Sequence, residues 1–537
     1  MADTTPTVQL PPLQQQLSPL KPPSVIADTT TTTTTTTVVE TSTATLKLPS
    51  LEPPHLQKSH SSPALTTLSS ANGKPAAATT TTTTTTRTKI RRMQFRPRMS
   101  PLDYANLESN KESFRGFFTL FWIAMGFYVI LTMIRNVELE GTLLSLSLFS
   151  LFSKDAVALM ISDFFMVGLT LGAVVYAKLL VWGWFRYYYF GMVLQHSLQT
   201  LFLGMNIYWT FFRDWPWVQS GFFVLHTIVM MMKMHSYTSL CGDLSVKYHR
   251  LTYLKRELPR WIAEHKHETY SEKEKAELGD MEEEIKELEE ELVQGQHRFP
   301  EIVTFVNYFD YLLVPSLVYQ LEYPRTDRIR PWYIFEKSVA TLGTFLLLYL
   351  TTERYILPTV FKPDMASWRV IIELLFPFMI NYLLIFYIIF ECICNAFAEV
   401  SRFADRSFYD DWWNSVTYDE FARKWNKPVH HFLLRHVYAS SIETYNLSKP
   451  NATFLTFFLS SCLHELVLVI VTRKIRMYLF IFQMLQLPLI WIGRLKFIQA
   501  RPWLGNVIFW VGMFCGPPLL GVLYCREVFW DVTNGEV

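Results

Sequence analysis

Long apolar runs constrain the fold of this chain more than any other feature of its sequence. A helix needs about 20 predominantly apolar residues to cross the hydrocarbon core of a bilayer. Runs near that length recur through the chain, in which 50% of the 537 residues are hydrophobic and only 18% are charged. Soluble chains of this size show alternating patterns and divide into domains instead. The sequence therefore predicts an all-α polytopic membrane protein.

We expect about nine transmembrane helices, several of them bordered by Trp, Tyr or Arg, which anchor spans at the membrane interface. The fourth and the eighth are short, and Pro488 interrupts the eighth. The run 143–152 is too short to cross. The predicted spans are 117–134, 156–184, 188–212, 217–234, 332–356, 368–393, 452–471, 477–492 and 505–524.

The amino-terminal 99 residues differ from the rest in composition. They are rich in Pro, Ser and Thr, with runs of threonine at 29–37 and 79–86. Too little apolar surface is present to offset the entropy of ordering, so residues 1–99 are predicted to be a disordered tail, followed by a membrane domain at 100–537. A basic patch from Arg87 to Arg98 closes the tail, which predicts a cytosolic amino terminus and contact with anionic lipid headgroups.

An odd number of spans places three connecting segments on the same side as the tail. They are 235–331, 394–451 and 493–504, and they hold most of the remaining Lys and Arg. This distribution agrees with the positive-inside rule. The basic turn 473–476 is an exception, because the same topology puts it on the lumenal side. Either that turn is unusual or one short segment does not cross.

Charge and cysteine content exclude several classes of function. The formal net charge is only +2, which gives no reason to expect a nucleic-acid partner. None of the six cysteines forms a CxxC pair, so neither a disulfide framework nor a zinc site is indicated. We expect no metal and no cofactor.

The loop 235–331 contains a strongly acidic stretch with helical periodicity. Apolar residues recur there at spacings of three and four, which predicts one apolar stripe on a charged helix. The stripe consists of Leu278, Met281, Ile285, Leu288 and Leu292. Two readings stay open: the stripe packs against the rest of the chain, or it forms a surface for self-association or for a partner.

The seventh predicted span, 452–471, carries His464 and Glu465 near its middle. An Asp, Lys or Arg at the centre of a span costs roughly 2.5 to 3.5 kcal/mol on insertion scales. Chains keep ionisable groups there mainly where these face protein, water or substrate. We therefore predict that His464 is a buried working residue, although a histidine held only by a hydrogen bond is the simpler reading.

The loop 394–451 combines basic residues with a dense set of aromatics around the sequence FYDDWWN, residues 408–414. Cations can meet phosphates, and tryptophans suit an amphipathic boundary. Membrane anchoring alone would need fewer rings. Acidic residues amid such rings usually cap or pair with Arg, so Asp411 is expected to have a structural role.

The sequence resembles the sterol and diacylglycerol acyltransferase branch of the membrane-bound O-acyltransferases. FYDDWWN matches the FYxDWWN signature of that branch, and the blocks YFDYLLVPSLVYQLEYPR and RKWNKPVHHFLLRHVY agree with it. The resemblance covers roughly residues 234–524. The blocks NAFAEVSRFADRSFY and TFFLSSCLHEL are most similar to the fungal sterol-esterifying members. Leu466 stands where diacylglycerol-type members have Tyr, which also favours sterol.

The resemblance implies an MBOAT fold whose helices enclose a reaction chamber. It implies transfer of a long-chain acyl group from acyl-CoA, a substrate, to a sterol hydroxyl in the endoplasmic reticulum membrane, forming steryl esters for storage. It also implies assembly as dimers or tetramers. The implied catalytic residues are His464 and Asn426. Acyl-CoA binding is implied for the signature residues Phe408, Tyr409, Asp411, Trp412, Trp413 and Asn414, and a secondary role for the HSY element His235, Ser236 and Tyr237.

The chemistry of these side chains supports such a reaction. A thioester is already activated, so the protein must remove a proton from the alcohol and stabilise an oxyanion, tasks that suit a histidine and a neutral amide. Ser460 and Ser461 precede His464 by one turn, which keeps a Ser–His acyl-enzyme open. Glu465 is a further secondary candidate.

Three other functions stay open. The nearest keeps the chemistry and makes diacylglycerol the acceptor. Another is a membrane transporter, since intramembrane histidine and broken spans also occur there, although no inverted repeat of hydropathy is evident. The last is a non-catalytic scaffold that uses the acidic helix and the tail.

Overall fold

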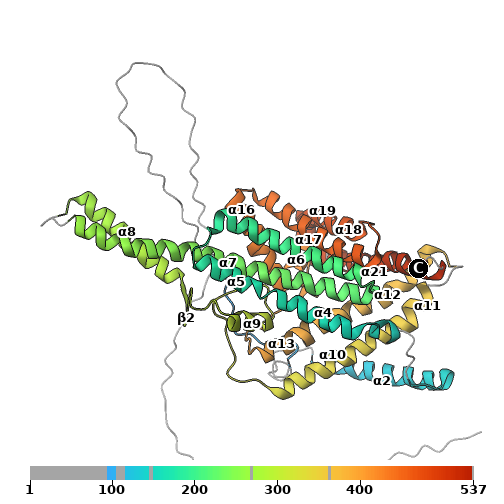
Figure 1. Ribbon diagram of the computed structural model, residues 1–537. Coiled ribbons are helices and arrows are strands. Elements are labelled where there is room, and N and C mark those ends of the chain that lie inside the picture. The colour runs from blue at the N-terminus through green and yellow to red at the C-terminus, as the bar shows by residue number, and fades with distance from the viewer. Residues whose placement is uncertain (1–92, 104–114, 144–148, 266–269, 361–364, 535–537) are drawn as a thin grey trace, which may run out of the picture. The chain divides into compact units, whose positions relative to one another are not determined.

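The computed structural model describes residues 93–103, 115–143, 149–265, 270–360 and 365–534. These residues are mostly helical, and their one sheet is the antiparallel pair β1 (Val293–Gln294) and β2 (His297–Arg298). The helices (Figure 1) are α2 (Arg115–Glu140), α3 (Phe149–Ser153), α4 (Ala156–Leu169), α5 (Gly172–Val181), α6 (Met192–Phe212), α7 (Trp217–Glu264), α8 (Glu272–Glu291), α9 (Phe305–Leu313), α10 (Pro331–Thr351), α11 (Leu357–Val360), α12 (Ser367–Phe386), α13 (Cys394–Val400), α14 (Tyr418–Lys424), α15 (Lys427–Leu433), α16 (Ser440–Tyr445), α17 (Lys449–Thr472), α18 (Tyr478–Met484), α19 (Gln486–Gly493), α20 (Lys496–Gln499) and α21 (Pro502–Asn534).

Short segments of other helix types connect several of these elements. They are the π-helical segments η1 (Tyr187–Gly191), η2 (Thr352–Ile356), η3 (Tyr387–Ile393) and η5 (Leu434–Ala439), and the 3₁₀ turn η4 (Trp412–Asn414). π-Helical turns are rare and are frequent at functional sites. Here η3 carries the buried Glu391 and η5 carries His436.

Six stretches of the described chain are long and apolar enough to cross a membrane. They are Thr119–Glu138, Ala156–Val181, Pro331–Val360, Trp368–Val400, Lys449–Thr472 and Pro502–Cys525, and they correspond to the first, second, fifth, sixth, seventh and ninth predicted spans. The other three predicted spans are also helical but are less apolar or shorter, so the count of nine stays a prediction. The chain is thus an all-α protein with multiple membrane-spanning helices, as its sequence predicts.

Helix α7 differs most from expectation. The apolar run ends near Met234, but α7 continues without a break to Glu264, a length of 48 residues. The predicted span 217–234 is therefore the first part of a longer helix. The second half of α7 carries basic side chains, and α8 packs alongside it (Figure 1).

Packing against α7 explains the apolar stripe of the acidic helix. Helix α8 starts at a capping box in which Ser271 and Glu274 satisfy each other's backbone N–H groups. Its stripe residues Leu288 and Leu292 are buried. Arg250 on α7 pairs with Glu284 at 2.8 Å. Of the two readings that the sequence left open, the structure supports packing within the chain.

The eighth predicted span is two short helices, α18 and α19, which meet at Leu485. Proline has no N–H to donate to the carbonyl four residues earlier, and its ring crowds that carbonyl. Pro488 thus cannot bond to Met484, and the helix breaks just before it. The expected interruption is present, three residues ahead of the proline itself.

Residues 93–103 form an extended strap over the loop that precedes FYDDWWN. The N–H of Arg98 donates to the carbonyl of Ala404, and the guanidinium of Arg98 makes two hydrogen bonds to the Asp405 carboxylate at 3.0 and 2.9 Å. Asp405 raises the pKa of Arg98 through these bonds. The predicted tail includes residues up to 99, but 93–99 pack on the domain. Arg98 binds protein here, and Arg87 to Arg92 lie outside the described residues.

The basic turn 473–476 packs against the turn between α6 and α7. Arg473 pairs with Asp214 at 2.6 Å and donates to the carbonyl of Trp215. Because the positive-inside rule counts Lys and Arg whatever their partners, these contacts do not remove the exception, and the side on which this turn lies stays a prediction.

Candidate active site

His464 lies on α17, and its tautomer follows from its hydrogen bond. The Nδ1 atom of His464 is 2.8 Å from the backbone carbonyl of Ser460, one turn earlier. A carbonyl oxygen can only accept a hydrogen bond, so Nδ1 carries the proton and Nε2 carries the lone pair. In this tautomer, a neutral imidazole can accept a proton at Nε2 from a ligand bound beside it.

The prediction that His464 is buried within the chain is wrong. Its side chain is exposed, whereas Ser460 and Leu468, one turn to either side on the same face, are half-buried. Burial decreases there because His464 stands at the border of the hydrophobic cluster that covers the carboxyl-terminal part of α17. The ring is therefore accessible to a ligand rather than enclosed by side chains, and the reaction chamber stays a prediction.

Asn426 is the N-cap of α15. Its Oδ1 accepts a hydrogen bond of 3.2 Å from the N–H of Val429, in the usual manner of an N-cap asparagine. Since Oδ1 is engaged, the amide group Nδ2 is the part of the side chain that is directed elsewhere. Asn426 is half-buried. Its geometry favours donation of a hydrogen bond over acceptance.

Asn426 and His464 project from the two arms of one helical hairpin. Helices α15 and α16, joined by η5, lead to a turn at 446–448, and α17 packs against η5 and α16. Asn426 precedes this turn by about as many residues as His464 follows it.

A shared hydrophobic cluster supports this geometry. On α15, Val429 and Leu433 follow Asn426 at helical spacing, and on α17, Val467 and Val471 follow His464 in the same way. All four valine and leucine side chains belong to one cluster with α7 residues such as Val224. Residues at spacings of three and seven share a helix face. The helix turns that follow the two candidate catalytic residues therefore pack in one hydrophobic cluster, which we call the packed seam, and His464 itself lies outside it.

Glu465 faces away from this seam and anchors other helices. Its carboxylate accepts hydrogen bonds from the N–H groups of Met477 and Phe480, at 2.8 and 3.0 Å, and from the hydroxyl of Tyr524, at 3.0 Å. It thus caps the start of α18 and ties α17 to α21. The sequence does not identify Tyr524 as a partner of Glu465, because no local pattern relates residues that lie 59 positions apart.

The serines beside His464 differ in availability. The hydroxyl of Ser461 is fully buried and donates to the carbonyl of Phe457 at 2.8 Å. It is therefore engaged within its own helix. Ser460 offers its carbonyl to His464, an arrangement that leaves Nε2 rather than Nδ1 as the reactive nitrogen.

The FYDDWWN segment divides into a buried half and an exposed half. Phe408, Tyr409 and Trp412 are almost completely buried, and the Tyr409 hydroxyl donates to Glu391 at 3.1 Å. The exposed half consists of Asp411, Trp413 and Asn414. Asp410 is half-buried, with 45% of its side chain exposed, so four of the seven side chains present surface to a ligand.

Asp411 pairs with Lys424 at 2.9 Å, as its predicted structural role requires. The hydrogen bond from Lys424 holds the pKa of the Asp411 carboxyl below its usual range. In the same loop, burial lowers the pKa of His431 to about 4. His431 is therefore neutral at physiological pH, and positive charge in the loop comes from Lys and Arg.

The HSY element lies inside the chain at the contact between α7 and η5. Ser236 accepts a hydrogen bond of 2.8 Å from the N–H of Tyr319 and is 2.8 Å from Nε2 of His436. His235 and His436 face each other with ring centroids 5.2 Å apart. Tyr237 is fully buried. Ser236 and Tyr237 thus support the elements around α17 and present little surface to a substrate.

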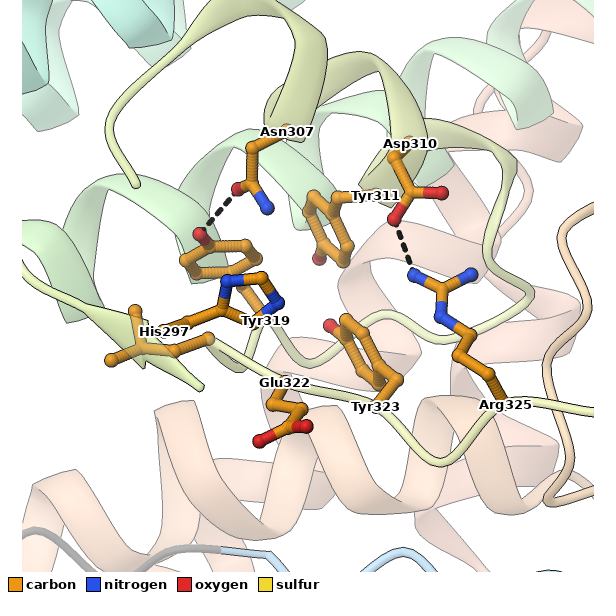
Figure 2. A pocket seen from close by; sticks show the side chains of 9 residues that line it. His297, Asn307, Asp310, Tyr311, Tyr319, Glu322, Tyr323 and Arg325 are labelled. Carbon is orange, nitrogen blue, oxygen red and sulfur yellow. Dashed lines mark hydrogen bonds and ion pairs between the residues drawn. The ribbon is translucent and has the colours of Figure 1, made fainter. Parts of the chain in front are cut away.

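A cavity of about 100 Å³ lies below α9 (Figure 2), and its lining residue Tyr319 is the partner of Ser236. Tyr311, Tyr319 and Tyr323 line it, together with an ion pair between Asp310 and Arg325. A cavity of this volume is far too small for coenzyme A. Among the described residues, no group of three or more His, Cys, Asp or Glu is arranged to hold a metal ion.

Comparison with known proteins gives a consistent result. Residues 159–526 match MBOAT, the membrane-bound O-acyltransferase family. The chain is 38% identical over 436 residues to the probable sterol O-acyltransferase 2 of Schizosaccharomyces pombe, which covers 78% of this chain and 88% of that protein. It is 34% identical over 464 residues to sterol O-acyltransferase 2 of Candida albicans, with coverages of 78% and 76%. A diacylglycerol O-acyltransferase 1 of Dictyostelium discoideum is 36% identical, but over only 43% of this chain.

Proposed function

The chain belongs to the membrane-bound O-acyltransferase family, and we propose that it esterifies sterols with acyl-CoA, using His464 as the general base and Asn426 as the oxyanion donor. It is an acyltransferase with multiple membrane-spanning helices, and its similarity to sterol O-acyltransferases extends over most of both chains. The observation that carries the assignment of His464 is the hydrogen bond from its Nδ1 to the Ser460 carbonyl, because this bond leaves Nε2 free to accept a proton.

The reaction proceeds by direct transfer. Nε2 of His464 takes the proton of the sterol 3-hydroxyl while the hydroxyl oxygen attacks the thioester carbon. The carbonyl oxygen becomes negative in the tetrahedral intermediate, and Nδ2 of Asn426 donates a hydrogen bond to it. The carbon–sulfur bond then breaks, and the imidazolium returns its proton to the thiolate, which leaves as free coenzyme A. The products are a steryl ester for storage and a regenerated neutral histidine.

The two substrates reach the histidine from different phases. The sterol dissolves in the bilayer, and the exposed ring of His464 is compatible with its entry from the lipid side. Coenzyme A is soluble and polyanionic, so its head group approaches from the basic loop 394–451. Of the signature residues, Asp411, Trp413 and Asn414 have the exposure to contact acyl-CoA. This arrangement fits an endoplasmic reticulum membrane with a cytosolic amino terminus, and a homodimer or tetramer.

Competition between acceptors tests the proposal. Microsomes containing the chain are supplied with labelled oleoyl-CoA and either ergosterol or diacylglycerol, and the esters are separated. We expect label in steryl ester at rates well above those in triacylglycerol. Predominant label in triacylglycerol would overturn the acceptor assignment. Recovery of protein-bound label without any acceptor would instead indicate an acyl-enzyme on Ser460.

A further inference from the structure

The segment that carries Asn426 is joined to the FYDDWWN segment by two backbone hydrogen bonds. The N–H of Asp410 donates to the carbonyl of Lys424 at 2.9 Å, and the N–H of Lys427 donates to the carbonyl of Phe408 at 3.0 Å. One bond lies before Asn426 and the other directly after it. The backbone of Asn426 is therefore held from both sides by residues of the signature.

An ion pair reinforces the second of these bonds. The Nζ atom of Lys427 lies 2.9 Å from Asp410 and 2.6 Å from the hydroxyl of Ser407, and the Lys427 side chain is only 10% exposed. Exposed ion pairs contribute little because water screens them. The Asp410 side chain is 45% exposed, but the lysine itself is sheltered. With two oxygen partners, Lys427 resists rotation of the first turn of α15, where Asn426 is the cap.

Aromatic packing restrains the residue on the other side of Asn426. The ring of Trp425 stacks on Tyr382 at 4.8 Å and lies 4.7 Å from both Phe386 and Trp412, between ring centroids. Such aromatic pairs stabilise the fold beyond the area they bury. Trp412 belongs to the signature, so the buried half of FYDDWWN packs against the neighbour of Asn426.

We propose that Asp410 and Lys427 are positioning residues, which act on the reaction through Asn426 rather than through acyl-CoA. An oxyanion donor works only if it is held in place before the charge develops, and these two residues hold the backbone that carries it. Asp410 is paired with Lys427, and the KM for acyl-CoA shows whether its half-exposed carboxylate also acts on that substrate. This inference rests on the proposed role of Asn426.

The test compares Asp410→Asn, Lys427→Met and Lys427→Arg with the wild type in microsomes. We expect kcat for sterol esterification to fall about tenfold in the first two variants, because small misplacements of catalytic groups cost that much or more. The KM for oleoyl-CoA should stay unchanged. Lys427→Arg retains the charge and should recover most of kcat. A raised KM with unchanged kcat would overturn the proposal and assign the pair to acyl-CoA binding.

A double variant tests whether the effect passes through Asn426. In an Asn426→Ser background, which keeps an N-cap but removes the amide, Asp410→Asn should cause less than about a twofold further loss, since residues that act as a unit are not additive. Independent, multiplying losses would overturn the inference while leaving the role of Asn426 intact. Full turnover in Asn426→Ser alone would instead refute the proposed function of that residue.

A matched control separates positioning from general destabilisation. Asp419 pairs with Arg423 at 2.6 Å within α14, in the same loop region. Asp419→Asn removes a similar charge and should leave kcat and KM unchanged. The thermal unfolding temperature in detergent is measured for every variant. Either of two results would show that Asp410 and Lys427 have only general structural roles. One is a tenfold loss of kcat in Asp419→Asn; the other is a loss of kcat that parallels the fall in unfolding temperature across all variants.

Discussion

His464 on α17 and Asn426 at the start of α15 are held in opposite ways. His464 is exposed and has one hydrogen bond, to the carbonyl of Ser460 in its own helix. Asn426 is flanked by backbone bonds, an ion pair and a stacked tryptophan. The difference matches the work of each group. A base must receive a proton and give it back, whereas an oxyanion donor is effective only if it does not reorganise.

Removal of the base should have the largest effect. We expect His464→Ala to lower kcat by about 10² to 10⁴, the usual contribution of a positioned general base. Because the His464 side chain is exposed and outside the packed seam, protein levels and the unfolding temperature should hardly change. The measurement is steryl ester formation from labelled oleoyl-CoA, normalised to protein by immunoblot. Normal turnover in His464→Ala would show that His464 is not the general base, and the comparison with Asn426 would lose its catalytic meaning.

Loss of the Asn426 amide should have the next largest effect. Asn426→Ser should lower kcat by about 10² to 10³, the cost of removing one oxyanion donor, while the unfolding temperature stays near that of the wild type. Asn426→Ala should lose activity to a similar extent and also about 1 kcal/mol of stability from the missing cap. If Asn426→Ser has the turnover of the wild type, Asn426 acts as a helix cap and not as a hydrogen-bond donor to the oxyanion. The contrast between a mobile base and a fixed donor would then disappear.

The exposed ion pair between Asp411 and Lys424 should matter least. Asp411→Asn is expected to change the free energy of unfolding by less than about 1 kcal/mol at pH 7, the usual range for exposed pairs. The folded pKa of Asp411 is lowered, so its contribution is complete at neutral pH and is lost as the pH falls through that lowered value. The free energies of unfolding of the wild type and of Asp411→Asn, measured from pH 7 down to acid pH, should converge. A difference that grows as the pH falls would contradict this assignment of the effect to the Asp411–Lys424 pair.

The sequence predicted the helical membrane fold and the position of His464 for clear physical reasons. Apolar runs and an ionisable group within one of them are local signals, readable without partners. The length of α7 was missed because its second half is polar and lies beyond the apolar run, although it continues the same helix to Glu264. The exposure of His464 was also missed, since periodicity does not show where a hydrophobic cluster ends.

Asn426 was identified only through resemblance, and its supports were not identified at all. The ion pair between Asp410 and Lys427 joins residues 17 apart, with η4 and α14 between them, and no periodic pattern relates one side chain to the other. The bond from Tyr524 to Glu465 spans a still larger separation. Such pairs follow from tertiary packing, and a single sequence contains no signal that would reveal them.

The strap at residues 93–103 has one more consequence. Its Arg98 binds the Asp405 carboxylate, five residues before Asp410. These strap residues precede the first of the six apolar membrane-spanning stretches of the described chain, whereas Asp405 follows the fourth. The two hydrogen bonds therefore fasten the beginning of the described chain to the loop that carries the signature.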